Sequence, residues 1–462
     1  MSTISMKRRW RAFALLAGAL FMTTVDLTIV NVALPTIGRD LHFSASGLQW
    51  IVTAYGLSFG GFLLLGGRAA DLLGRRRVLM GGLAVFTAAS LGAALAPSAG
   101  FLIAMRALQG LGAATFLPAA LAIVTDMFTE GAERNKALGI WGGIGAAGGT
   151  AGLIAGGLLT RYAGWQSIFF LNVPIGAAAL ALAPRIVPDS RRATARSRLD
   201  PLGALTVTGG LLALVYAISK APEAGWGSAR TIAWLAAAAA LLIAFVVVES
   251  RVEAPLLPLR IFGLRQVAAA NAVGLLLGAG FFGYIYVGTL FMQEVLGYSA
   301  LQTGLAWAGA SSLSLALAGV SQKLVTRISP GPVMALGMAM IGGGALWTTQ
   351  VLVHAHFWSS LAAPFFIVGA GTAFAFIPIS IGGLTGVAER DAGLASGLLN
   401  TSQQLGGAIG VAIASTVLTS GFHSAFLVCG VIGLLALPTL ALLLGRGWSA
   451  RIRRLVPAWE GE

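Results

Sequence analysis

The stretch GGRAADLLGRRRV, residues 66–78, places five charged residues between two long apolar segments. Four arginines and one aspartate fall between positions 68 and 77, although only 10% of the chain is charged. A basic loop between apolar segments is typical of a cytoplasmic turn between membrane helices, because Lys and Arg accumulate on that side. Topology alone leaves Asp71 unexplained, since a lone carboxylate at a helix end costs desolvation free energy unless it is paired. An ionic latch that closes one side of the molecule, and breaks when the molecule moves, would explain it.

The composition of the chain points to lipid as the solvent for much of its surface. Of 462 residues, 57% are hydrophobic, whereas roughly 45–50% is usual in soluble domains. Many of the 63 glycines lie in apolar runs, where small residues let membrane helices pack closely. We attribute the net charge of +14 to cytoplasmic loops and expect no nucleic-acid partner. The single cysteine, Cys429, excludes a disulfide framework and a cysteine metal site, and we expect neither metal nor cofactor.

Apolar stretches recur along the chain at the length that a membrane helix requires, about 20 residues. They predict an all-α polytopic membrane protein. Fourteen are found, at approximately 12–34, 48–67, 78–97, 100–125, 136–160, 167–187, 202–219, 229–248, 267–291, 301–325, 332–352, 359–381, 393–419 and 423–445.

The distribution of basic residues between the loops supports this number. With a cytoplasmic N-terminus, 25 Lys and Arg fall on the inner side and four on the outer side, while Arg106 lies within a stretch. One miscounted helix would exchange the sides beyond it and remove the asymmetry. Both termini are therefore predicted to be cytoplasmic. A composition rich in Ala, Gly and Arg suggests a bacterial source, and hence the inner membrane.

Two polar connections divide the chain. The stretch at 188–201 separates six apolar stretches from the rest, and a charged stretch at 249–265 precedes the ninth. We therefore expect a 6+2+6 arrangement: a six-helix bundle at 12–187, a cytoplasmic linker with two extra helices at 188–266, a second six-helix bundle at 267–445 and a cytoplasmic tail at 446–462. Two six-helix halves around a central site are a common transporter plan.

Motifs along nearly the whole chain resemble, in order, the fourteen-helix drug:proton antiporters of the major facilitator superfamily. The opening stretch resembles the loop between helices 2 and 3 of that superfamily. VDLTIVNVALPTIGRDL at 25–41 resembles helix 1, RALQGLGAA at 106–114 the helix-4 motif, and SIFFLNVPIG at 167–176 the start of helix 6. FMQEVLGYSALQTGL at 291–305 and AGLASGLLNTSQQLGGAIGVAI at 392–413 resemble segments of the second half. The resemblance implies a major facilitator fold and export of drugs or antibiotics in exchange for protons.

The chain departs from this family at one motif. Helix 5 of the family usually carries a Gly-Pro pair before a Gly-Gly pair, whereas this chain has Gly152-Leu153 ahead of Gly156-Gly157. The family motif is associated with antiport, so its loss leaves open an uptake symporter or a uniporter of the same fold. The spacing of Gly148, Gly152 and Gly156 is kept and predicts close helix packing.

Two ionisable residues lie within the predicted spans, where such residues are costly and typically functional. Asp26 and Arg106 are predicted at similar depth, roughly 9–12 Å below the outer edge at 1.5 Å per residue. Our hypothesis is that Asp26 takes up and releases a proton while Arg106 competes for its carboxylate. The resemblance points to the same two positions. The alternative is a static buried ion pair that fixes helix packing.

Further polar and aromatic residues are candidates for a substrate cavity or a gate. Gln109 is three residues after Arg106 and either lines the cavity or bonds to a neighbouring helix. The resemblance suggests that Asp71, Arg75 and Asp126 form a cytoplasmic gate; an isolated helix-end charge is the alternative for Asp126. The candidate cavity residues are Asn31, Trp50, Tyr55, Gln109, Asn172, Gln293, Asn400 and Gln403.

These observations predict a transporter driven by an ion gradient. The chain contains no phosphate-binding GxxxxGK[ST] motif, and no headgroup-level cluster of nucleophile, acid and base, so we do not expect an enzyme. The expected partners are a small organic substrate, protons and the lipid bilayer. The expected activity is proton-coupled efflux by alternating access, with uptake as the alternative.

Overall fold

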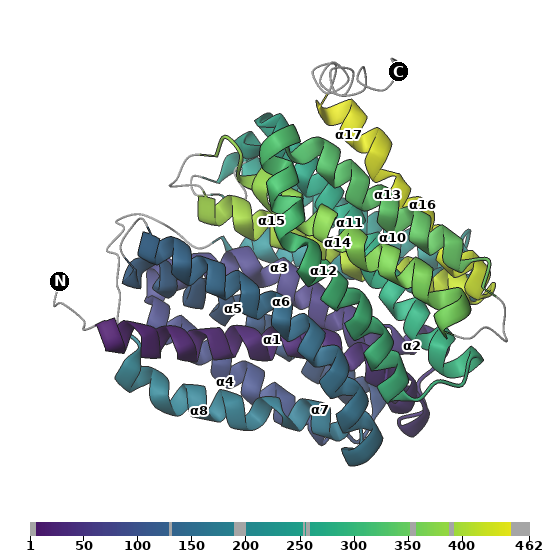
Figure 1. Ribbon diagram of the computed structural model, residues 1–462, viewed down its shortest axis with the longest axis horizontal. Coiled ribbons are helices and arrows are strands. Elements are labelled where there is room, and N and C mark those ends of the chain that lie inside the picture. Colours follow the sequence, from purple (N-terminus) through teal and green to yellow (C-terminus); the bar gives the residue numbers. More distant parts are fainter. Residues whose placement is uncertain are drawn as a thin grey trace, which may run out of the picture. The chain divides into compact units, whose positions relative to one another are not determined.

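The computed structural model describes residues 6–128, 132–188, 200–252, 255, 259–351, 357–387 and 392–444, and throughout this part the regular structure is helical (Figure 1). The predicted tail at 446–462 lies outside the described residues. The first ten helices are α1 (Met6–Asp40), α2 (Ala45–Leu48), α3 (Trp50–Leu73), α4 (Arg75–Ala94), α5 (Ala99–Met127), α6 (Ala132–Ala163), α7 (Gln166–Phe170), α8 (Asn172–Ile186), α9 (Pro201–Ala224) and α10 (Ala229–Arg251).

The later part of the chain contains two π-helical turns and a 3₁₀ turn among its α-helices. These elements are η1 (Leu259–Gly263), α11 (Arg265–Leu290), η2 (Phe291–Val295), α12 (Ala300–Ile328), α13 (Pro330–Thr348), η3 (Phe357–Leu361), α14 (Ala362–Leu384), α15 (Ala392–Leu418), α16 (Phe422–Leu434) and α17 (Ala436–Leu444).

Each of the fourteen predicted stretches overlaps a helical segment. Among the described residues, 12 helical segments are long and apolar enough to cross a membrane. The other two stretches fall on α3, where the apolar part counted is Trp50–Leu63, and on α15, which carries the polar run NTSQQ at 400–404. The chain is therefore a multi-pass helical membrane protein.

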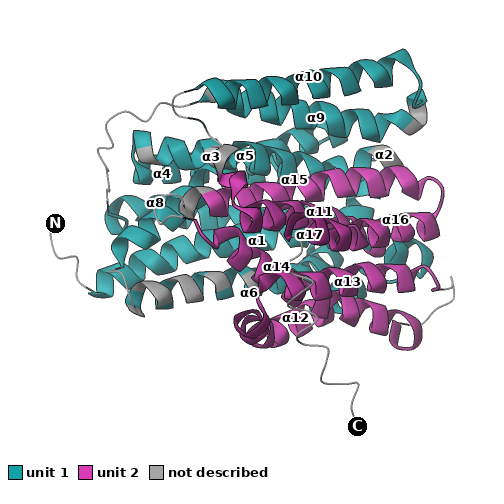
Figure 2. Ribbon diagram, turned by 90° about the horizontal axis from the view of Figure 1, so that it is seen from above, with its two compact units in different colours: residues 1–257, 289–308 teal, residues 258–288, 309–462 magenta. Residues whose placement is uncertain are grey.

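The chain forms two compact units (Figure 2). The first contains residues 1–257 and 289–308, and the second contains residues 258–288 and 309–462. Within the first unit α9 packs on both α10 and α3. A Cβ atom on Gly61 of α3 would lie 2.3 Å from the Thr208 hydroxyl of α9, so these two helices meet at a residue without a side chain. The two extra helices thus belong to the first unit.

Glycines at four-residue spacing bring α6 against α1. Cβ atoms on Gly148 and Gly152 would lie 2.0 Å and 2.1 Å from the hydroxyls of Thr24 and Thr28, and one on Gly156 would lie 2.7 Å from the Ile29 carbonyl. The predicted close packing is confirmed. The Thr28 hydroxyl also donates to the Gly149 carbonyl at 3.0 Å. Small residues therefore let a side chain of one helix bond to the backbone of the other.

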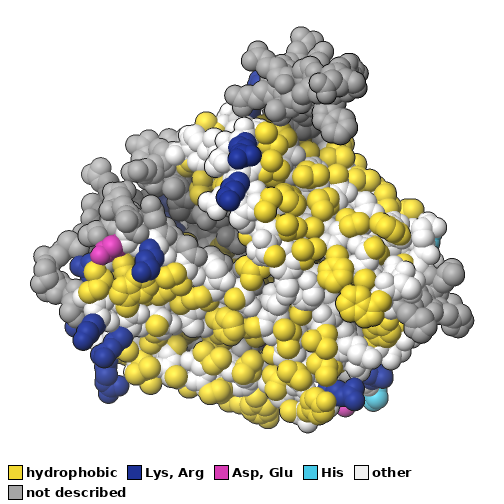
Figure 3. All heavy atoms as spheres, in the orientation of Figure 1, with side chains coloured by type: hydrophobic (Ala, Val, Ile, Leu, Met, Phe, Trp, Pro, Cys, Tyr) yellow, Lys and Arg dark blue, Asp and Glu magenta, His cyan; other side chains and the backbone are white. Residues whose placement is uncertain are grey.

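The surface fits a lipid environment. Hydrophobic side chains cover much of the face shown in Figure 3, and charged side chains occupy only a few small groups. Exposed large apolar residues occur along the membrane helices, among them Ile243 of α10 and Leu315 of α12, which are 64% and 51% exposed. In water such exposure would be costly, whereas lipid tails accept it.

Candidate functional site

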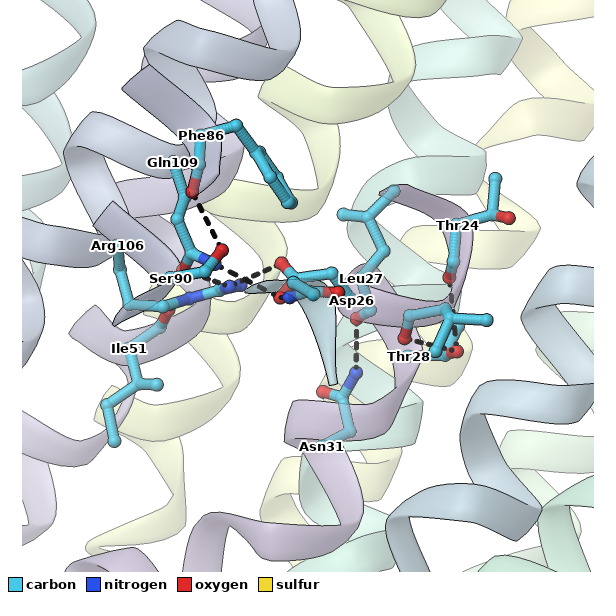
Figure 4. Close-up of polar contacts among 12 residues, drawn as sticks. Thr24, Asp26, Leu27, Thr28, Asn31, Ile51, Phe86, Ser90, Arg106 and Gln109 are labelled. Carbon is cyan, nitrogen blue, oxygen red and sulfur yellow. Dashed lines mark hydrogen bonds and ion pairs between the residues drawn. The ribbon is translucent and has the colours of Figure 1, made fainter. Parts of the chain in front are cut away.

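The structure brings Asp26 and Arg106 together inside the first unit. An Arg106 amino group lies 2.6 Å from the Asp26 Oδ2 atom, and the two residues are 0% and 1% exposed. Figure 4 shows the carboxylate of α1 and the guanidinium of α5 pointing toward each other. The ion pair is fully desolvated, which requires further hydrogen bonds to offset the cost of burial.

The second carboxylate oxygen of Asp26 accepts two amide hydrogen bonds. The Asn172 side chain donates to Oδ1 at 2.8 Å and the Gln109 side chain donates to it at 3.2 Å. Asn172 is the first residue of α8, and Gln109 is one turn after Arg106 on α5. Every group bonded to the carboxylate is therefore a hydrogen-bond donor, so both oxygens of the desolvated carboxylate have partners.

Arg106 is held by more than its carboxylate partner. Its Nε atom donates to the Ile51 carbonyl of α3 at 2.9 Å, and it donates to the Gln109 Oε1 atom at 2.9 Å. The Gln109 amide also donates to the Ser90 hydroxyl of α4 at 2.8 Å. Of the two predicted roles of Gln109, bonding to neighbouring helices is what the structure shows. The network ties α1, α3, α4, α5 and α8 to one point.

Aromatic rings cover the guanidinium. The Arg106 Cζ atom lies 4.4 Å from the ring centre of Tyr55 and 5.8 Å from that of Phe169, both within the range of cation–π attraction. The Tyr55 hydroxyl and the Asn172 Oδ1 atom are buried and accept or donate no hydrogen bond within the described part of the chain. Two unsatisfied polar atoms at the edge of a buried ion pair are costly, and typically mark a functional site.

Sequence reasoning missed Ser90 and Phe169. Ser90 lies in an apolar span, and its hydroxyl donates to the Phe86 carbonyl of its own helix. Nothing in the sequence around it indicates that this hydroxyl also accepts a bond from the Gln109 amide. Phe169 lies in the motif that contains Asn172, but a phenylalanine in an apolar run is most often core. Neither residue carried a signal in its local pattern that separated it from its neighbours.

Several other candidate cavity residues have local partners instead. The Asn31 amide donates to the Leu27 carbonyl of its own helix at 3.0 Å, and the Trp50 ring lies 6.4 Å from that of Tyr216 on α9. The Gln293 amide of η2 donates to the Val32 carbonyl of α1 at 2.8 Å. These three residues do not join the Asp26 network.

The two candidates on α15 belong to the second unit. Asn400 is exposed. Gln403 is partly buried, and a Cβ atom on Gly278 of α11 would lie 2.1 Å from its carbonyl, so α11 and α15 are in close contact there. About two turns further back on α11, Asn271 is buried and accepts a bond from Ser402 at 2.9 Å. This interhelical polar pair was not predicted.

Arg75 and Asp126 form an ion pair between the start of α4 and the end of α5. The Arg75 guanidinium also donates to the Ala122 carbonyl at 3.0 Å. Gly74, which separates α3 from α4, has a φ of 100°, a conformation that side chains disfavour. Asp71 is in the last turn of α3, and its side chain lies outside the described residues. Arg76, which was not predicted, donates to the Pro184 and Val187 carbonyls at the end of α8.

Among the described residues, no group of three or more His, Cys, Asp or Glu side chains is placed to hold a metal ion. The site thus consists of one ion pair, two amides, two hydroxyls and aromatic rings. Such a set can bind and release a proton and can bind an organic molecule by stacking and hydrogen bonds.

Comparison with known proteins gives the family. The chain matches the family model of the Major Facilitator Superfamily over residues 16–291 and 273–457, and it belongs to that superfamily. It is 40% identical to the cephamycin export protein CmcT of Amycolatopsis lactamdurans, over 89% of this chain and 85% of that protein. It is 39% identical to the puromycin resistance protein pur8 of Streptomyces alboniger, over 91% of this chain and 84% of that protein.

Solved structures share the fold at low sequence identity. The POT family transporter PepTSo matches 95% of this chain and 98% of its own with a TM-score of 0.69 at 14% identity. The nucleoside transporter NupG matches 95% of this chain and 100% of its own with a TM-score of 0.68 at 12% identity. At these identities the likeness concerns the fold alone.

Proposed function

We propose that this protein exports small organic compounds, drugs or antibiotics, in exchange for protons across the bacterial inner membrane. The observation that carries the proposal is the Asp26–Arg106 pair, buried among the membrane helices of a chain whose relatives are named as export and resistance proteins. The names of those relatives support efflux of an organic compound, and the ion pair supplies a group that can bind a proton.

In the proposed cycle, protonation of Asp26 neutralises the carboxylate and releases Arg106 from it. The loss of a charge-assisted bond between α1 and α5 would favour the alternative arrangement of the helices. Substrate and proton exclude each other in this scheme, because the substrate binds while Asp26 is charged and paired with Arg106, and protonation of Asp26 breaks that arrangement and releases the substrate. Asp26 and Arg106 are therefore the coupling residues in this proposal.

The proposal includes a fourteen-span topology arranged 6+2+6 with both termini in the cytoplasm. The basic residues favour this orientation. It places Arg75 and Asp126 on the cytoplasmic side, where their ion pair would form part of the gate with Asp71. The remaining candidates, including Asn31, Trp50, Tyr55, Gln109, Asn172, Gln293, Asn400 and Gln403, are proposed to surround the substrate in at least one state of the cycle.

The sequence of α6 favours a second candidate, an uptake symporter or uniporter. Leu153 stands where the family usually has proline, and α6 is continuous from Ala132 to Ala163. A proline at 153 would remove the helical bond to the Gly149 carbonyl and kink the helix. The glycine contacts with α1 remain, so what is lost is the kink and not the packing.

Everted membrane vesicles with an acidified lumen separate the two candidates. A panel of cationic dyes and antibiotics, including a cephamycin and puromycin, would be added while the pH gradient is followed. Antiport predicts proton release on addition of a substrate, and its loss in Asp26→Asn. Glu294→Gln, which removes a carboxylate outside the network, is the matched control and should respond like the wild type. Proton uptake with the substrate, or no dependence on Asp26, would contradict the proposal.

A further inference from the structure

The Asn172 side chain is the only neighbour bonded to Asp26, among the described residues, that has a free hydrogen-bond acceptor. Its Nδ2 atom donates to the Asp26 carboxylate at 2.8 Å, while its Oδ1 atom is buried without a partner. The Gln109 Oε1 atom is already bonded to Arg106, and Arg106 has donors only. Within this network, the charged carboxylate is satisfied and the Asn172 oxygen is not.

Protonation of Asp26 changes the hydrogen-bond partners that its side chain requires. A carboxylic acid carries an O–H donor and needs an acceptor, and the three groups that now bond to the carboxylate all present N–H groups. A half-turn of the Asn172 amide about its terminal torsion exchanges Nδ2 for Oδ1 at nearly unchanged positions. The proton that binds from solution forms an O–H bond on Asp26, and this O–H then donates to the Asn172 oxygen.

We propose that Asn172 is a positioning residue whose side-chain amide rotates when Asp26 is protonated, so that its oxygen accepts the new O–H group. The inference rests on the proposed role of Asp26 as the proton carrier. Arg106 of α5 and Tyr55 of α3 are the charged and titratable groups that face Asp26, and α8 contributes the neutral amide of Asn172.

Asn172 lies at a place in the fold where rotation of its amide can affect the surrounding helix. The span at residues 166–186 continues from α7 into α8 through Leu171, which keeps helical backbone angles. Pro174 has no N–H group and leaves the Phe170 carbonyl without its usual helical bond. Asn172 thus lies in a turn that lacks one backbone hydrogen bond, where a change in one side-chain hydrogen bond bends the helix more easily than in a regular helix.

Infrared difference spectroscopy of the purified full-length protein in lipid tests the proposal. The band measured is the carbonyl stretch of the protonated Asp26 carboxyl, assigned by its absence in Asp26→Asn. In the wild type the band should lie at the lower frequency of an acid that donates a hydrogen bond. In Asn172→Leu, an apolar near-isostere, it should move to the higher frequency of an acid without an acceptor. Asn172→Val, which is smaller, should give the same shift if the leucine variant does not fold.

Asn271→Leu is the matched control, because it removes a buried amide from the second unit and should leave the band unchanged. A wild-type band at the frequency of a free acid, or a band that Asn172→Leu leaves in place, would overturn the inference. The measurement also separates this inference from the proposed function. If no Asp26 band appears at any pH, Asp26 does not carry the proton, and the proposed function fails first.

Discussion

At the scale of single residues, the Asp26–Arg106 pair was predicted from the cost of charges in apolar spans, from the similar depth of the two residues and from the family resemblance. Charged residues in apolar spans are costly unless they are paired, so two opposite charges at similar depth are expected to form an ion pair. Their partners were harder to find, because Ser90 and Phe169 are distant in sequence and unremarkable in type. The acceptor that Asn172 leaves unused could not be predicted at all, since it depends on which atom of one amide faces one carboxylate.

The Arg106 guanidinium bonds to α1, to α3 and to Gln109 of its own helix, so its removal should strongly destabilise the protein. Arg106→Ala leaves a buried carboxylate uncompensated, which typically costs about 3–5 kcal/mol of the free energy of unfolding. We expect a clearly lowered Tm in detergent. Asp26→Asn in the same chain should restore part of that loss, because it removes the unpaired charge. A double variant no more stable than Arg106→Ala would contradict an electrostatic origin.

Arg106→Lys tests the geometry of the site separately from its charge. A lysine ammonium keeps the charge but cannot bond to Asp26, Ile51 and Gln109 at once with the flat fork of an arginine. We expect Tm to fall less than in Arg106→Ala, while substrate-dependent proton release falls at least about tenfold, the equivalent of 1.4 kcal/mol. Wild-type exchange in this variant would show that charge alone suffices.

At the scale of helices, the contact of α6 with α1 was predicted from glycine spacing and is confirmed. Gly152→Val should separate the two helices, since even a Cβ atom would lie 2.1 Å from the Thr28 hydroxyl and 2.7 Å from the Val25 carbonyl. We expect a loss of more than about 1 kcal/mol of stability, the usual range for overpacking. Thermal unfolding in detergent measures it. Gly149→Ala is the matched control, because a Cβ atom there has nothing within 4 Å.

At the same scale, the turn between α3 and α4 depends on one backbone conformation. Gly74 has a φ of 100°, so Gly74→Ala should cost roughly 1–3 kcal/mol and displace Arg75 from Asp126. Labelling of cysteines placed near the start of α4 and the end of α5 would report this displacement. Gly81→Ala, in open space on α4, should leave labelling unchanged. The charges in the sequence predicted this turn, whereas the positive φ of Gly74 became visible only in three dimensions.

At the scale of the whole molecule, the fold class followed from hydrophobic run length and the family from motif order. The packing of α9 on α3 did not follow, because it depends on a threonine that meets a glycine more than a hundred residues away. The proposed topology predicts that alkaline phosphatase inserted after Gly227, between α9 and α10, is active, and that a C-terminal green fluorescent protein fluoresces. Failure of one reporter alone would require a different number of spans, and failure of both would require the opposite orientation.

The complete burial of Asp26 has a kinetic consequence. A carboxylate with 0% exposure meets no bulk water in this arrangement, so a proton reaches it only after the helices around it separate. The rate of protonation is then limited by the rate at which the helices separate, and not by the rate of proton transfer to the carboxylate. In heavy water, the exchange rate should consequently change little when opening is slow, whatever the affinity of the carboxylate for its proton. In the proposed exchange, closure of the helices around Asp26, rather than the acidity of its carboxyl, would therefore set the time at which the proton gradient drives transport.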